Sequence, residues 1–153
     1  AYEFSPDISR EAVANDLALL RLDQPITTDA AGPLLVSSLG SAATLKIVAY
    51  GRDRAYAPSL RENCGVLDRS AGVLVLDCAV TFGVSGAPVL TTDGSSVVAV
   101  VSAMGKSDTG EEFAIAPLAL DQLDALMSDL GKHPSSDLES PSAGPQIRPV
   151  RCP

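Results

Sequence analysis

Residues 81–90 read TFGVSGAPVL, a serine set between two glycines and followed by a proline and an apolar run. Glycine lets the backbone approach a ligand closely and adopt conformations that a side chain would forbid. A nucleophilic serine needs this freedom if its own N–H and a neighbouring N–H are to point at one developing oxyanion. The stretch therefore predicts a tight loop that leads into a β-strand, with Ser85 as a candidate nucleophile.

Around this loop, residues 34–116 are dominated by turn residues and short runs of valine, isoleucine and leucine. The Asp93-Gly94 pair between two apolar runs predicts a hairpin turn. Several short strands at this spacing favour an antiparallel barrel or sandwich. The expected strands are Leu45–Tyr50, Gly72–Ala79, Ala87–Thr91, Val97–Ala103 and Glu112–Ile115.

The period then changes from that of a strand to that of a helix. Apolar residues recur at helical spacing from Ala119 to Leu130, Pro117 suits a first turn, and Gly131 suits a C-terminal cap. Residues 132–153 contain five of the eleven prolines and no hydrophobic period. We expect a closing helix followed by a disordered or loosely docked tail.

A second motif lies near the start of the chain, where residues 15–26 read NDLALLRLDQPI. Together with residues 81–90 it resembles the trypsin/chymotrypsin-like serine peptidases, of the bacterial type. In that family the aspartate of the catalytic triad begins an Asp-hydrophobic-Ala-Leu-Leu-x-Leu segment, and the nucleophile follows in Gly-Asp/Asn-Ser-Gly-Gly/Ser/Ala-Pro. The resemblance covers roughly the first 130 residues. It implies that Ser85 is the nucleophile, that Asp16 orients a histidine, and that the N–H groups of Gly83 and Ser85 form the oxyanion hole.

The resemblance also implies an all-β fold, a trypsin-like antiparallel Greek-key β-barrel with a C-terminal helix. On this reading residues 1–33 are a remnant of the N-terminal barrel and the linker between barrels. Residues 34–131 are the C-terminal barrel with its closing helix, and residues 132–153 are the tail. From the residues alone, Ser9–Leu22 fits an amphipathic helix and Leu17–Leu22 fits a half-buried strand equally well.

This chain departs from the family pattern at the general base. Its one histidine, His133, lies far downstream of Asp16, and a serine hydroxyl is a poor nucleophile without a base. We therefore expect the histidine to come from a segment or chain not present in this sequence. Val84 also replaces the acid or amide that is usual before the nucleophile. An α/β-hydrolase elbow, with His133 as base, fits less well because Ala87 stands where that motif needs its second glycine.

The resemblance also implies the substrate contacts. Ala79, six residues before Ser85, would form the floor of the side-chain pocket and offers no charge to a basic side chain. The segment Ser102-Ala103-Met104 would pair with the substrate backbone as an added strand. Glutamate-specific relatives carry a histidine just before that serine, where this chain has Val101. We expect small or medium apolar side chains to bind.

The same resemblance implies a Cys64–Cys78 disulfide, and two free thiols in a cytosolic protein are the alternative. A bridge of this kind requires an oxidising compartment, which predicts a secreted or periplasmic protein. Cys152 would be free or would pair outside this chain.

Composition narrows the partners. The 153 residues carry a formal net charge of −8, which argues against nucleic acid and anionic membrane surfaces as partners. No apolar run approaches the ~18 residues needed to cross a bilayer. No metal cluster or phosphate loop is visible, so no cofactor is expected. The sequence thus predicts a serine endopeptidase that acts on a peptide or protein, with a catalytically inactive peptide-binding relative of that fold as the alternative.

Overall fold

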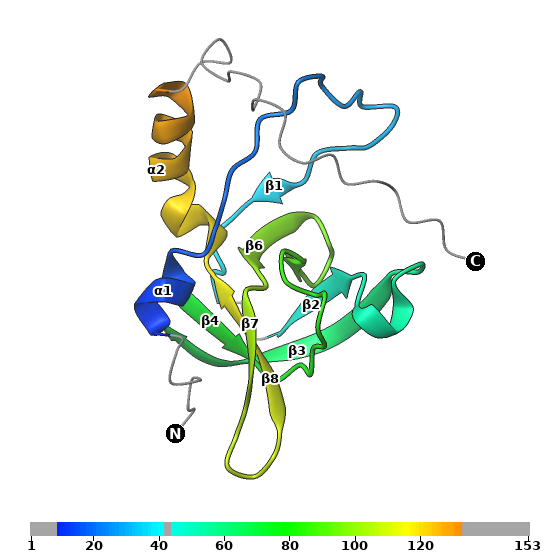
Figure 1. Cartoon of the computed structure of the whole chain (residues 1–153), viewed down its shortest axis with the longest axis vertical. Helices are drawn as coiled ribbons and strands as arrows, with labels where there is room; N and C mark the ends of the chain where they lie inside the picture. Colours follow the sequence, from blue (N-terminus) through cyan, green and yellow to red (C-terminus); the bar gives the residue numbers. More distant parts are fainter. Residues whose placement is uncertain (1–8, 42–43, 133–153) are drawn as a thin grey trace, which may run out of the picture.

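A computed structural model describes residues 9–41 and 44–132 (Figure 1). The described elements are, in chain order, helix α1 (Arg10–Ala14), strands β1 (Leu35–Val36) and β2 (Thr44–Ala49), the 3₁₀ turn η1 (Arg52–Arg54), strands β3 (Ser59–Ser70), β4 (Val73–Leu76), β5 (Pro88–Thr91), β6 (Ser96–Val100), β7 (Ala103–Lys106) and β8 (Glu112–Pro117), and helix α2 (Ala119–Lys132).

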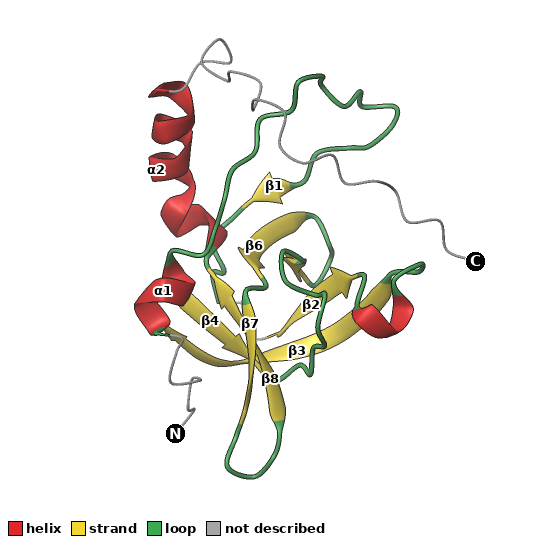
Figure 2. Ribbon diagram, viewed as in Figure 1, coloured by secondary structure: helices red, strands yellow, loops and turns green. Residues whose placement is uncertain are grey.

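The strands form one eight-stranded sheet in the order β1-β6-β5-β2-β3-β4-β8-β7. All neighbours are antiparallel except β1 and β6, which run parallel. No continuous ladder closes the sheet among the described residues, although a single bridge joins Ala99 of β6 to Leu118 beyond β8. The protein is therefore β-rich, with α2 as the C-terminal helix (Figure 2). This confirms the coarse prediction of a β fold with a closing helix.

Two hydrophobic clusters stabilise the sheet, one on each side of β4. Every residue of β4 is buried, because its successive side chains point to opposite faces. Leu74 and Leu76 belong to the main core, which they share with β2, β5 and β6. Val73 and Val75 belong to a smaller cluster that includes Val13 of α1. Helix α1 thus covers the face of β4 that the main core leaves uncovered.

The expected strand Val97–Ala103 is wrong in its extent, because the chain changes partner within it. The Val101 N–H donates to Ala87 O, whereas the next N–H, that of Ser102, donates to Ile115 O. One apolar run therefore supplies both β6 and the start of β7. The expected strand Gly72–Ala79 is too long as well, since β4 ends at Leu76.

Strand β3 was not predicted from the sequence, and its composition explains why. Its twelve residues, SLRENCGVLDRS, are largely polar and mostly exposed. The strand is also irregular, because Asn63 has a positive φ of 57° and the pairing register shifts along both of its edges. A strand that buries so few side chains carries no clear period-two signal.

The hairpin predicted at Asp93-Gly94 is confirmed between β5 and β6. Gly94 has a φ of 79°, and its N–H donates to Thr91 O over 2.8 Å. Hydrogen bonds from the Thr91 hydroxyl and from Ser95 hold the pKa of Asp93 at about 2, below its ordinary value. Helix α2 also forms as predicted, but Pro117 is the last residue of β8 rather than part of the first helical turn, and Gly131 lies inside the helix rather than at its C-terminal cap.

A disulfide joins Cys64 of β3 to Cys78, with their Cα atoms 5.2 Å apart. This confirms the pairing that the resemblance implied. It ties β3 to the segment that leads from β4 into the loop around Ser85. Within the described part of the chain, no helix is long and apolar enough to cross a membrane. His133, Cys152 and the predicted tail lie outside the described residues, apart from Lys132 in α2.

Candidate active site around Ser85

Most of the backbone N–H groups next to Ser85 are hydrogen-bonded within the loop or to the residue that follows β6. The N–H groups of Val84, Gly86 and Ala87 donate to Thr81 O, Val101 O and Val84 O respectively. Those of Gly83 and Ser85 have no hydrogen-bond acceptor among the described residues. Both residues are exposed, so the pair predicted to form an oxyanion hole is available to a ligand.

Glycine is required at position 83 for two reasons. Its φ is 89°, a conformation that other L residues rarely adopt. A Cβ added there would also lie 3.2 Å from the Arg52 nitrogen, because the adjacent Phe82 O accepts a 2.8 Å hydrogen bond from the Arg52 N–H. The loop is thereby fixed to the segment that follows β2.

Ser102 connects the two predicted catalytic side chains. Its hydroxyl donates to Asp16 Oδ2 over 2.6 Å, and its carbonyl accepts a hydrogen bond from the Ser85 hydroxyl over 3.2 Å. Ser102 occupies the point at which the chain leaves β6 for β7. The change of strand partner described above therefore places one residue between Asp16 and Ser85, which are far apart in the sequence.

Asp16 reaches Ser102 because α1 is docked on the sheet. Val13 is 2% exposed in the smaller cluster, and Arg10 forms a 2.9 Å ion pair with Asp68 of β3. Ser9 caps the helix by accepting from the Ala12 N–H, and the Asp16 N–H donates to Val13 O as the helix ends. The chain then continues without regular structure to β1. Neither the longer helix nor the strand considered for this region forms.

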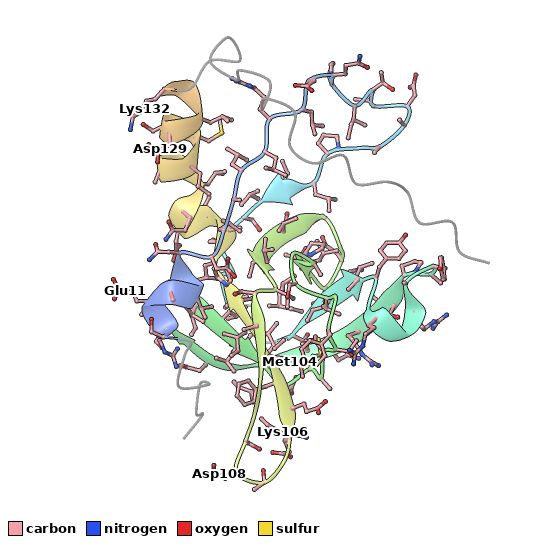
Figure 3. The ribbon with its side chains drawn as sticks, viewed as in Figure 1. Glu11, Met104, Lys106, Asp108, Asp129 and Lys132 are labelled. Atoms are coloured by element: carbon pink, nitrogen blue, oxygen red, sulfur yellow. A yellow bond between two sulfur atoms is a disulfide. The ribbon has the colours of Figure 1, made fainter. Side chains whose placement is uncertain are left out.

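A cavity of about 450 Å³ opens beside Ser85. It is bounded on one side by the Ser85 loop and on the other by the start of β7, and Figure 3 labels Met104 at this place. No charged side chain lines it; the lining residues are Val80, Thr81, Phe82, Val84, Ser85, Val101, Ser102, Ala103 and Met104. The predicted substrate segment Ser102-Ala103-Met104 therefore lies together with Ser85.

Ala79 does not line that cavity. It lines a neighbouring one of about 120 Å³, together with Arg54 and Arg61. The two cavities share Val80, Thr81 and Val84, so they adjoin at the segment that precedes Ser85. Sequence reasoning missed the two arginines, since they lie in a turn and a strand that showed no pattern of their own.

Strand β7 ends the sheet and pairs only with β8 among the described strands. Its far edge is open to an added strand. The β7–β8 hairpin projects from the body of the molecule, with Lys106 and Asp108 toward its tip (Figure 3). No group of three or more histidine, cysteine, aspartate or glutamate side chains in the described chain could hold a metal ion.

No family model matches this chain, and no curated protein matches it.

Proposed function

We propose that this chain is the nucleophile-bearing part of a trypsin-like serine endopeptidase, with Ser85 as nucleophile and Asp16 as the orienting carboxylate. The observation that carries the proposal is the pair of hydrogen bonds that link both side chains to Ser102. The two motifs are separate in the sequence, and the side chains of Asp16 and Ser85 both contact Ser102. The histidine would come from a segment or chain not present in this sequence.

The region around Asp16 has room for such a segment. Asp16 is exposed, and in the chain that follows it Leu20 and Leu22 are 81% and 56% exposed. A further segment that packed beside Asp16 would cover these exposed apolar side chains. A histidine placed here would donate a hydrogen bond to Asp16, which would orient its ring toward the Ser85 hydroxyl.

The reaction would then proceed by acyl transfer. The histidine takes the proton of the Ser85 hydroxyl as Oγ bonds to the scissile carbonyl carbon, and the N–H groups of Gly83 and Ser85 hold the resulting oxyanion. The protonated histidine gives its proton to the leaving amine as the C–N bond breaks. Water, deprotonated by the same histidine, releases the acyl group and restores Ser85.

Substrate contacts follow from the cavity beside Ser85 and from β7. A peptide added to the open edge of β7 would place one side chain in this cavity, whose neutral lining favours small or medium apolar groups. The open sheet would correspond to the C-terminal Greek-key barrel of the family. The disulfide supports a secreted or periplasmic location, because such bonds persist in oxidising compartments.

The alternative is a peptide-binding module of the same fold that performs no catalysis. The favouring observation is that no histidine precedes Asp16 in this sequence, so the Ser85 hydroxyl has no base to which it could donate. Such a module would retain the β7 edge and the apolar cavity as its binding surface.

Turnover of a peptide library, measured in protein that includes the histidine, distinguishes the two functions. We expect Ser85→Ala to abolish turnover and Asp16→Asn to lower it by about four orders of magnitude, because the histidine would be held in the wrong tautomer. Ser128→Ala is the matched control, since Ser128 is an exposed serine on α2. Full activity in the Ser85→Ala protein would refute the nucleophile, and an inactive wild type would favour the binding module.

A further inference from the structure

The smaller cavity has an apolar floor and a basic rim. Ile47, Val80 and Val84 are buried beneath it, whereas Arg54 and Arg61 are exposed at its edge. Arg54 ends η1, and Arg61 comes from β3, where it pairs directly with Ile47 of β2. Directly paired residues of an antiparallel ladder lie on the same face of the sheet. Two guanidinium groups from different elements therefore border one hollow.

These arginines are unusual for a chain with a net charge of −8. Residues 50–61 contain three arginines and one acid, Asp53. Neither Arg54 nor Arg61 forms an ion pair with a described side chain; the ion pairs in the described chain involve other residues. The third arginine, Arg52, stacks on Phe82 with its guanidinium carbon 5.0 Å from the ring centroid. A cluster of cations without counter-charges, set over an apolar floor, favours binding of an anion.

The basic cavity also adjoins the candidate nucleophile. It shares Val80, Thr81 and Val84 with the cavity beside Ser85. Phe82, on whose ring the Arg52 guanidinium stacks, directly precedes Gly83. A peptide that is added along β7 and fills the larger cavity would therefore lie close to the arginines of the smaller one. Guanidinium groups bind carboxylates with matching fork geometry.

We propose that the cavity bordered by Arg54 and Arg61 binds a carboxylate, supplied by an acidic side chain of the peptide substrate. The assignment of the source to the substrate rests on the proposed function, whereas the carboxylate site itself does not. The substrate would then be a peptide that carries an apolar residue for the neutral cavity and an aspartate or glutamate for the basic one.

Binding to the 153-residue chain tests this without requiring catalysis. Fluorescence anisotropy would measure the affinities of labelled octapeptides for the chain. Each peptide carries an alanine or valine for the neutral cavity, and the peptides of the series place either glutamate or glutamine at one of the positions that follow it. We expect glutamate peptides to bind about tenfold more tightly at one position, since each exposed ion pair is worth up to about fivefold. The preference should disappear in an Arg54→Gln/Arg61→Gln variant. It should persist in Arg69→Gln, an exposed arginine further along β3.

Titration with glutarate, a free dicarboxylate, distinguishes a site for the acidic side chain of a peptide from a site for a free carboxylate. Guanidinium NMR signals of Arg54 and Arg61 that shift with glutarate, and competition of glutarate with the glutamate peptide, would support the proposal. Equal affinity for glutamate and glutamine peptides would overturn it, and glutarate shifts in that case would assign the cavity to a free carboxylate. Failure to bind any peptide, neutral or acidic, would instead count against the proposed function.

Discussion

Gly83 shows how one residue constrains the candidate oxyanion hole. Its positive φ and its 3.2 Å approach to the Arg52 nitrogen both oppose a side chain, and the atom it would meet belongs to the backbone. We expect Gly83→Ala to lower the free energy of unfolding by about 1–3 kcal/mol for the unfavourable conformation, with a further loss from the contact with the Arg52 backbone.

Gly110→Ala is the matched control for this substitution. Gly110 has nearly the same φ, 87°, but no atom lies within 4 Å of its added Cβ. Chemical denaturation of both variants separates the two causes, because Gly110→Ala carries only the conformational cost. An equal loss of stability in the two variants would contradict the claim that the Gly83 loop is held against Arg52.

Among the individual site residues, only the two motifs identified Ser85 and Asp16 as candidate catalytic residues. The sequence could not predict that Ser102 contacts both, because that contact joins residues 86 positions apart in the case of Asp16. Nor could it place Ala79, which lines the basic cavity rather than the one beside Ser85. Such positions depend on where the chain changes strand partner, and residue type alone does not encode this.

Among the elements, the short helix α1 has the largest consequence for the site. It has five residues, too few to be stable alone, so its position depends on docking. Its anchor, Val13, packs with Val73, Val75, Phe113 and Ile115. Strands β2, β5 and β8 were predictable nearly to their ends, and α2 was predictable because its apolar residues recur at helical spacing. The sequence allowed α1 only as part of a longer helix over Ser9–Leu22 and did not predict β3, since each of these elements buries few side chains.

Val13→Ala tests the docking of α1. Removing two buried carbons should cost about 2 kcal/mol of the free energy of unfolding, at roughly 0.8 kcal/mol per methylene with a further cost for the cavity. It should also speed hydrogen exchange at the Asp16 N–H, which donates to Val13 O. Ile26→Ala, at a side chain 62% exposed, should change stability by less than about 0.5 kcal/mol. Unchanged stability in the Val13 variant would show that α1 does not hold Asp16 in place.

At the scale of the whole molecule, a buried core stabilises the sheet, and the proposed binding surfaces lie at its exposed edges. The main core packs β2, β5 and β6 together, and the disulfide ties β3 to the segment before the Ser85 loop. The edge of β7 and the surface around Asp16 remain exposed. The coarse β architecture was predictable from turn residues and short apolar runs. The open order of the sheet was not, because strand pairing follows from contacts distant in the sequence.

The central claim is that Ser85 is a nucleophile that lacks only its base, and labelling with a fluorophosphonate probe tests it most directly. The chain alone should not react, since no histidine precedes Asp16. Added imidazole, a small base that can bind beside the exposed Asp16, should allow stoichiometric labelling that peptide mapping assigns to Ser85. Ser128→Ala should label like the wild type and Ser85→Ala should not label. Labelling that persists in Ser85→Ala, or no labelling in the wild type at any imidazole concentration, would contradict the account.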